Sequence, residues 1–415
     1  HDDLRADLKA RGYEFTSQTD TEVIAHRIHH HLEKTPKLFD AVQATVKELH
    51  GAYALAVMSE KDSDTLVLAR AGCPVVVGIG KGENFVASDV SALLPVTRDF
   101  MFLEEGDVAA IHREKVEIVD AAGARVERPV KQSELSADAV DKGDYAHYML
   151  KEIHEQPRAV AQTLEERVAG HRLLAAAFGP AAEEVLKKTE AVQIVACGTS
   201  WHAGSVARYF IEQICRLPCW VDIASEFRYR QPVVPKNTLF VTISQSGETA
   251  DTLAALRLAK QAGYLSSLAI CNAPESSLVR ESELVMLTRA GPEIGVASTK
   301  AFTTQLAALG MLVVALGKHH GMEPEREGNL VKRLTEIPRL IDETLSLDPV
   351  IQELAKKFVD KNHALFLGRG ALAPIAAEGA LKMKEISYIH AEAYAAGELK
   401  HGPLALVDAD MPVVV

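Results

Sequence analysis

Residues Thr238-Leu-Phe-Val-Thr-Ile243 are followed directly by Ser244-Gln-Ser-Gly-Glu-Thr249. A short apolar run that ends in a turn signal is typical of a buried strand. A helical pattern begins after Thr249 and continues to about Ala262. The stretch is therefore predicted to be a strand, a polar loop and a helix, which is the first part of a βαβ unit. The question it raises is why the loop carries so many small polar side chains.

The same order of strand, loop and helix recurs on both sides of this stretch. Further strands are predicted at residues 192–196, 267–270 and 284–287, with helices from about residue 202 and from residue 295 through 316. Strands that alternate with helices predict a parallel, doubly wound sheet. The unit then restarts with Ala364–Leu367, Gly-Arg-Gly and a helix from about Pro374, which suggests a duplication.

The first third of the chain has a different pattern. Residues 1–33 favour helices, and residues 53–126 favour short strands joined by turns, which together predict an α+β module rich in antiparallel sheet. Residues 127–145 are polar and weakly patterned and are expected to be a linker. Helical periodicity returns at residues 148–168, where Pro157 is expected to mark a break or a first turn.

Composition excludes several classes of partner. The chain has 415 residues and a formal net charge of −12, which argues against nucleic acid or an anionic membrane as a partner. An anionic ligand would have to be bound by local donors. The five cysteines are scattered without zinc spacing and are expected to be free thiols. No signal peptide is seen and the longest apolar run, Gln305–Leu316, is too short for a bilayer, so a cytoplasmic location is expected.

Three predicted strand ends carry hydroxyl-rich loops: Thr199-Ser200, residues 244–249 and Ser298-Thr299. In a doubly wound sheet these ends share one edge, where helix N-termini direct N–H groups toward a ligand. Any one loop alone is better explained by helix capping. Three at one edge favour a phosphorylated small molecule. Residues 78–82, Gly-Ile-Gly-Lys-Gly, match no nucleotide fingerprint and are read as a turn.

A predicted helix near the C-terminus carries candidate catalytic residues. Glu378, Lys382 and Glu385 are spaced i, i+4 and i+7 and share one helix face. The alternative is a solvated salt-bridge stripe. His401 follows in the loop Gly397–Pro403, where an exposed imidazole could act as an acid or a base.

Four histidines at positions 26, 29, 30 and 31 raise the question of a zinc site. No further ligand type stands at a known spacing, so a histidine run on the surface is the favoured interpretation and no metal is expected.

At this point the sequence resembles the glutamine–fructose-6-phosphate aminotransferases (isomerizing). The resemblance spans nearly the whole chain and rests on the stretches Ser17–His26, Phe102–Asp107, His147–Pro157, Ala196–Ser200, Ala224–Arg230, Ser244–Thr252, Gly295–Gln305 and Glu378–Pro403. It implies an α/β protein with the later part of a glutaminase of the N-terminal-nucleophile type at residues 1–114. Connecting helices at 115–180 and two flavodoxin-like sugar isomerase (SIS) domains at 181–321 and 354–415 would follow, the second incomplete.

The resemblance also implies roles for single residues. Asp20 would hold the glutamine α-amino group, whereas the glutaminase nucleophile would lie before His1 and a Schiff-base lysine after Val415, so that the chain is expected to be a fragment of a longer enzyme. The implied sugar-phosphate contacts are Thr199, Ser200, Ser244, Gln245, Ser246 and Thr249, with Val296 and Ser298 near the sugar. His401 would open the hexose ring, Glu385 would move a proton between C1 and C2, and Lys382 and Glu378 would assist.

The resulting expectation is an enzyme that makes glucosamine 6-phosphate and glutamate from fructose 6-phosphate and L-glutamine, with no cofactor and as a homodimer. Two alternatives remain open. One is a non-catalytic sugar-phosphate sensor built from SIS domains, which would have no need for Glu385 and His401. The other is an amino-sugar-phosphate deaminase or deglycase without a glutaminase, against which residues 1–114 argue.

Overall fold

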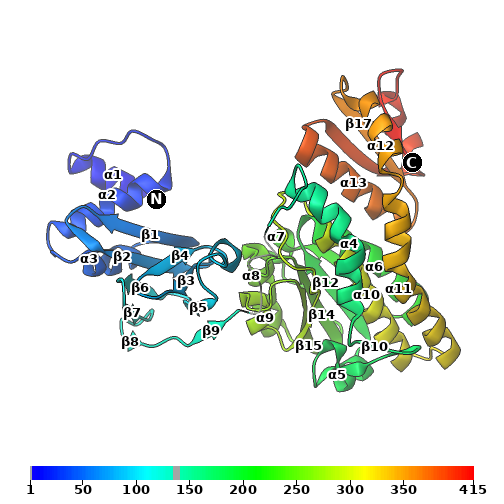
Figure 1. The fold of residues 1–415 in the computed structure, drawn as a ribbon, viewed down its shortest axis with the longest axis horizontal. Helices are drawn as coiled ribbons and strands as arrows, with labels where there is room; N and C mark the ends of the chain where they lie inside the picture. The colour runs from blue at the N-terminus through cyan, green and yellow to red at the C-terminus, as the bar shows by residue number, and fades with distance from the viewer. Residues whose placement is uncertain (1, 134–140) are drawn as a thin grey trace. The chain divides into compact units, whose positions relative to one another are not determined.

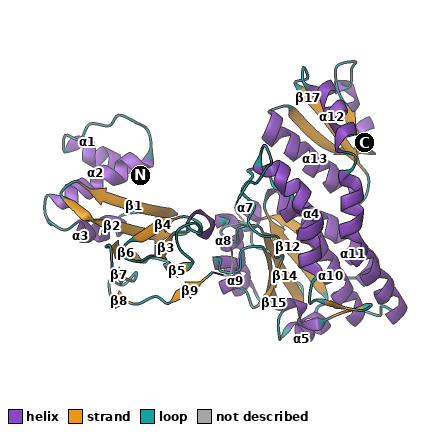
Figure 2. Cartoon of the chain, in the orientation of Figure 1, coloured by secondary structure: helices purple, strands orange, loops and turns teal. Residues whose placement is uncertain are grey.

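The structure is a computed structural model that describes residues 2–133 and 141–415, and Figures 1 and 2 show its helices and strands. The chain divides into two compact units, His1–Asp141 and Lys142–Val415. Each unit is described separately below.

Within its described residues, the first unit combines three α-helices with two antiparallel sheets. The helices are α1 (Asp2–Ala10), α2 (Asp20–Leu32) and α3 (Leu38–Val46). One sheet has the strand order β1-β2-β6-β7-β8 and the other has the order β4-β3-β5-β9. Their strands are β1 (Tyr53–Ser59), β2 (Asp62–Ala71), β3 (Val76–Ile79), β4 (Asn84–Ala87), β5 (Asp99–Phe102), β6 (Val108–Ile111), β7 (Val116–Val119), β8 (Arg125–Val126) and β9 (Val130–Gln132).

Strand β2 explains why the sheet is covered on both faces. Its side chains alternate in direction along the strand. Val67 and Ala69 pack in a cluster with residues of α2 and α3, whereas Leu68 packs in a second cluster with Val75 and Val77. The strand therefore belongs to two hydrophobic cores, one on each face.

The first unit extends beyond residue 114, the boundary expected from the sequence. Strands β7 and β8 hydrogen-bond into the sheet that contains β1. The expected linker at 127–145 is partly structured, because β9 pairs with β5 and Arg128 forms a two-point ion pair with the fully buried Asp107 at 2.8 and 2.9 Å. Residues 134–140 of that segment lie outside the described residues.

The second unit contains a five-stranded parallel sheet with the strand order β13-β12-β14-β15-β16. Its strands are β12 (Ala191–Ala196), β13 (Cys219–Ile223), β14 (Thr238–Ser244), β15 (Ser266–Cys271) and β16 (Leu284–Leu287). Numbered along the sheet, the order is 2-1-3-4-5, which is the flavodoxin-like arrangement and confirms the predicted fold class. Strand β13 was not predicted. It is an edge strand with Trp220 and Ile223 exposed, and Asp222 interrupts its apolar residues, so it lacks the continuous apolar run of a central strand.

Helices precede, connect and follow these strands along the chain. They are α4 (Tyr148–Leu164), α5 (Ala182–Lys188), α6 (Gly198–Phe210), α7 (Ala224–Phe227), α8 (Ala250–Ala262), α9 (Ser277–Glu281), α10 (Lys300–His319), α11 (Pro324–Leu345) and α12 (Asp348–Ala355), with a small hairpin of β10 (Val168–Ala169) and β11 (Arg172–Leu173) after α4. The expected break at Pro157 is wrong, since α4 continues through it. Proline lacks the N–H that the carbonyl of Ile153 would accept, and the side-chain amide of Gln156 donates to that carbonyl instead at 2.9 Å.

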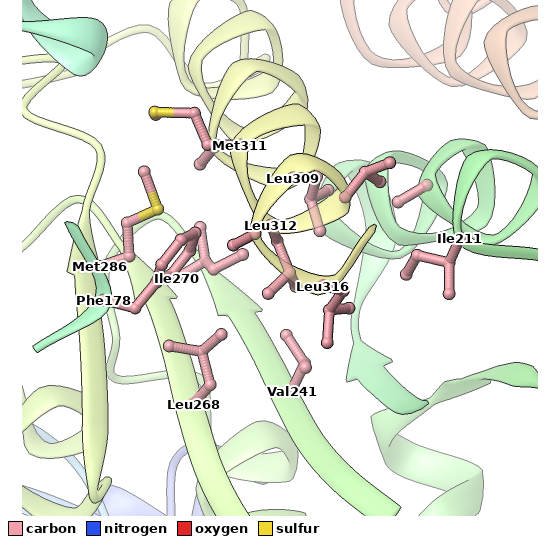
Figure 3. Packing of buried hydrophobic residues seen from close by; sticks show 14 of the residues in the cluster. Phe178, Ile211, Val241, Leu268, Ile270, Met286, Leu309, Met311, Leu312 and Leu316 are labelled. Atoms are coloured by element: carbon pink, nitrogen blue, oxygen red, sulfur yellow. The ribbon is translucent and has the colours of Figure 1, made fainter. Parts of the chain in front are cut away.

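Helix α10 is the centre of the largest hydrophobic core. Leu309, Leu312 and Leu316 face the sheet residues Val241 and Leu268, as Figure 3 shows. Among the described residues, α10 is the one helix long and apolar enough to cross a membrane, but 78% of its apolar window is buried inside the protein. Its composition is therefore that of a core helix.

A second, smaller parallel sheet follows, with the strand order β18-β17-β19. Its strands are β17 (His363–Gly368), β18 (His390–Ala395) and β19 (Val413–Val414), and helix α13 (Leu372–Ser387) connects β17 to β18. This order repeats the order β13-β12-β14 of the larger sheet, which supports the predicted duplication. Helix α13, which follows the first strand of the repeat, contacts α6, the equivalent helix of the first copy.

Candidate active site

The three hydroxyl-rich segments predicted from the sequence meet at one pocket of about 200 Å³ in the second unit. The pocket lies at the carboxyl ends of β12 and β14, beside the segment that precedes α10. Its lining residues are Cys197, Thr199, Ser200, Ile243, Ser244, Gln245, Ser246, Thr249, Thr252 and Ser298. Seven of the eight residues expected to contact or lie near the sugar phosphate are in this set.

The exception is Val296. Its side chain is 98% exposed and it does not line the pocket, whereas Ser298 does. A contact between Val296 and a sugar remains a prediction.

Hydrogen bonds within the loop at residues 244–249 fix its conformation. The Ser244 Oγ accepts the N–H of Gly247 at 2.9 Å, and the Ser246 Oγ accepts the N–H of Glu248 at 3.2 Å. Gly247 has φ +66°, and a Cβ at this position would lie 2.0 Å from the Ser276 Oγ. Glycine is therefore required here by both conformation and space.

The helix-capping alternative accounts poorly for two of the three segments. Cys197 and Thr249 are the residues that precede α6 and α8, and neither makes a side-chain capping bond within the described part of the chain. The first N–H groups of a helix need partners, and an anion in the pocket would supply them.

The third segment is held by two carboxylates. Glu152 of α4 accepts the N–H groups of Ile294 and Gly295 at 2.5 and 3.0 Å. Glu293 accepts the N–H of Thr299 at 2.8 Å, and it caps α10 in place of a hydroxyl. Burial raises the pKa of Glu152, against the smaller opposing effect of its backbone hydrogen bonds.

Helix α13 brings its acidic residues to the same place. Glu378 is 5% exposed, which excludes the solvated stripe for this residue. Its Oε1 accepts the hydroxyl of Thr199 at 2.9 Å, and its Oε2 lies 2.7 Å from the Nδ1 of His202. The Nζ of Lys382 donates to Thr199 at 3.2 Å and to the Glu385 Oε2 at 2.5 Å, and lies 3.4 Å from the Glu378 Oε1. The first SIS repeat and the second therefore share one polar cluster.

His202 was not identified from the sequence. The available signal was its spacing of i, i+3 from Thr199, which places the two side chains on one face of α6. His401, in contrast, was predicted but does not join the cluster. It is exposed in the turn between two short 3₁₀ helices, and across residues 2–133 and 141–415 no contact with Glu378, Lys382 or Glu385 is observed.

Asp20 lies in the first unit, where it is the first residue of α2. The loop before it is organised by Glu22, whose carboxylate accepts the N–H groups of Thr16 and Ser17, both at 2.7 Å. The Ser17 hydroxyl also donates to this carboxylate and has the largest effect on its pKa. Together with the backbone hydrogen bonds it lowers the pKa of Glu22 to about 2. The predicted contact of Asp20 with glutamine is not tested by this geometry.

The histidine run lies only partly on the surface, so the predicted surface run is wrong in part: His29 is exposed, whereas His26 and His31 are half-buried. His30 is 8% exposed, and burial lowers its pKa. His29 hydrogen-bonds to Tyr13 at 3.0 Å, and His31 forms an ion pair with Glu48 at 2.9 Å. In the described ranges, no group of three or more His, Cys, Asp and Glu side chains is arranged to hold a metal ion.

The cysteines are free, as expected. Burial raises the pKa of Cys215 to about 12, and it also raises that of Cys197, which lines the pocket. A high pKa leaves these thiols protonated and weakly nucleophilic at neutral pH.

Comparison with known families defines the class of the protein. Residues 185–315 and 357–415 match the SIS domain family, and residues 1–95 match the glutamine amidotransferase domain family. The protein is therefore a glutamine amidotransferase joined to SIS repeats.

Individual relatives narrow this class. The chain is 60% identical over all 415 residues to glutamine–fructose-6-phosphate aminotransferase [isomerizing] of Shewanella oneidensis and 61% identical to that of Pseudomonas putida, and spans 68% of the length of each. Its structure resembles the C-terminal domain of glucosamine-fructose-6-phosphate aminotransferase from Francisella tularensis with a TM-score of 0.65 and 53% identity, over 66% of this chain and 77% of that one. The chain belongs to the family of glutamine–fructose-6-phosphate aminotransferases (isomerizing).

Proposed function

We propose that the protein converts fructose 6-phosphate and L-glutamine to glucosamine 6-phosphate and glutamate, with the sugar bound between the hydroxyl-lined pocket and α13. The observation that best supports this proposal is that Thr199, which lines the pocket, is hydrogen-bonded directly to Glu378 and Lys382. The anion-binding and acid–base groups are thus in contact.

The phosphate is the part of the sugar that the pocket suits. The net charge of −12 gives no general attraction for an anion, so binding must come from local donors. The hydroxyl groups of Ser200, Ser246 and Thr249, together with the first N–H groups of α6 and α8, provide them. These contacts would fix one end of the sugar and position its reacting carbons.

The chemistry requires ammonia and a proton transfer. Hydrolysis of glutamine gives glutamate and ammonia, and ammonia replaces the oxygen at C2 of fructose 6-phosphate with loss of water. Transfer of a proton from C1 to C2, with the proton of the C1 hydroxyl passing to the nitrogen, then gives the amino aldose. Glu385 is the proposed base for this transfer, because its carboxylate is partly accessible and is held by Lys382 at 2.5 Å. Glu378 is buried and is better suited to hold Lys382.

A pair of substitutions tests the two halves of this proposal in the full-length protein. Ser246→Ala should weaken binding of glucosamine 6-phosphate, measured by calorimetry, by about tenfold, since one hydrogen bond to a charged group contributes about 1.5 kcal/mol or more. Glu385→Gln should leave binding within about threefold. It should abolish exchange of the C1 proton of fructose 6-phosphate in D2O, followed by NMR.

The matched control is Glu353→Gln, an exposed glutamate on α12, which should change neither property. Retention of proton exchange in Glu385→Gln, or unchanged binding in Ser246→Ala, would contradict the proposal. Absence of C1 proton exchange in the wild type, together with loss of binding in Ser246→Ala, would favour the non-catalytic sugar-phosphate sensor.

We also propose that the protein is a cytoplasmic homodimer. The resemblance implies that His401 acts in ring opening, and its separation from the cluster on α13 supports a contribution from a neighbouring subunit. Sedimentation of the full-length protein should show a dimer, and a monomer with full activity would contradict this.

A further inference from the structure

The first turn of α6 presents two donors to one carboxylate of the other SIS repeat. Thr199 and His202 are three residues apart on the helix. The hydroxyl of Thr199 binds one oxygen of Glu378 at 2.9 Å, and the Nδ1 of His202 lies 2.7 Å from the other. Each oxygen of the carboxylate therefore has its own partner on α6.

Glu378 depends on these partners because it is buried. A buried carboxylate is stable only when hydrogen bonds and an opposite charge replace its water. The His202 side chain is 12% exposed. Its ring packs edge-on against that of Trp201, with the two ring centroids 5.2 Å apart, so packing also holds the imidazole in place.

The contact extends beyond Glu378. Lys382 lies 3.4 Å from the Oε1 of Glu378 and 2.5 Å from the Oε2 of Glu385. The position of Lys382 is thus set between the two carboxylates, and the position of Glu385 depends in turn on Lys382. A rotation of Glu378 would release this arrangement.

We infer that His202 is a positioning residue: it fixes Glu378 from the first SIS repeat and thereby aligns Lys382 and Glu385 on the second. The inference rests on the proposed function, because it assigns His202 to the same proton transfer. His202 does not line the pocket. Its contribution is to turnover and not to phosphate binding.

The atom that makes the contact gives a sharp test. Nδ1 of histidine and Nδ2 of asparagine are both attached to Cγ, so an asparagine at position 202 places a donor near the same point. Glutamine has its amide one bond further from the backbone, and leucine has no donor. The prediction is therefore that asparagine at position 202 preserves turnover and that glutamine does not, although both side chains are uncharged amides.

The experiment measures kcat and KM for fructose 6-phosphate in the full-length His202→Leu, His202→Asn and His202→Gln variants, together with thermal unfolding. His202→Leu and His202→Gln should lower kcat about 10- to 100-fold with KM within about threefold of wild type, because misplacement of a catalytic group by about 1 Å costs this much. His202→Asn should recover kcat to within about threefold. His171→Leu, an exposed histidine in the same unit, is the matched control and should be unchanged.

The outcomes separate the inference from the function on which it rests. An inactive wild type would refute the proposed function. With an active wild type, equal kcat in His202→Asn and His202→Gln, or full kcat in His202→Leu, would overturn the inference. If His202→Leu fails to fold, the comparison of Asn with Gln still decides, because both retain a polar side chain.

Discussion

Replacement of Gly247 by alanine tests whether the loop at residues 244–249 is a ligand-binding loop. The residue has φ +66°, and an added Cβ would lie 2.0 Å from the Oγ and 2.5 Å from the Cβ of Ser276. No alanine can occupy this position unless the loop or Ser276 moves.

The magnitude follows from the separate costs. The left-handed conformation costs about 1–2 kcal/mol for a residue with a Cβ. Displacement of Ser276 breaks its hydrogen bond to the carbonyl of Ala273, at 2.9 Å, and adds about 1 kcal/mol. Together these costs should lower the free energy of unfolding by about 2–3 kcal/mol. Movement of the loop should also raise the Kd for glucosamine 6-phosphate by more than about tenfold.

The control is Gly263→Ala. Gly263 also has a positive φ, +88°, but no atom lies within 4 Å of the position that a Cβ would occupy, so this variant has the backbone cost without the overlap. Calorimetry with glucosamine 6-phosphate and thermal unfolding should show a larger loss of stability in Gly247→Ala and a loss of affinity in that variant alone. Equal behaviour of the two variants would refute the reasoning.

Two further predictions concern the second unit. Leu312→Ala in α10 should lower the free energy of unfolding by about 2–5 kcal/mol, because Leu312 is fully buried, whereas Leu174→Ala, at a side chain 40% exposed, should lower it by less than about 1 kcal/mol in the same denaturant titration. Equal losses would contradict the assigned core. Burial raises the pKa of Glu152, so the wild type loses stability as pH rises from about 4.5 through the folded-state pKa. The melting temperature of Glu152→Gln should therefore rise relative to wild type between pH 4 and pH 7, and a difference that does not change with pH would contradict this.

The parallel sheet could be predicted from the sequence because its central strands are continuous apolar runs. Strand β14 is buried at every position, and its apolar residues end where the strand ends. Strand β13 was missed because it is an edge strand whose short apolar run is interrupted by Asp222. Strand β9 was missed for a similar reason, since all three of its residues are exposed and only backbone pairing with β5 defines it.

The pocket was predictable from the hydroxyl groups at strand ends, because parallel strands bring these ends together without knowledge of side-chain contacts. The contact of His202 with Glu378 was not, since 176 residues separate them in the chain. Local periodicity carries no information on which helix of one repeat faces which helix of the other. The same limit applies to Glu152, which reaches Gly295 over a separation of 143 residues.

The equivalence of the two parallel sheets has a consequence for how the enzyme can change over evolution. If one ancestral unit was copied, the descendant that contains β14 came to specialise in retaining the substrate and the descendant that contains α13 in transforming it. Variation in the first copy should then alter which phosphorylated sugars are admitted, while variation in the second should alter what becomes of them. New specificities and new reactions could arise independently in one polypeptide.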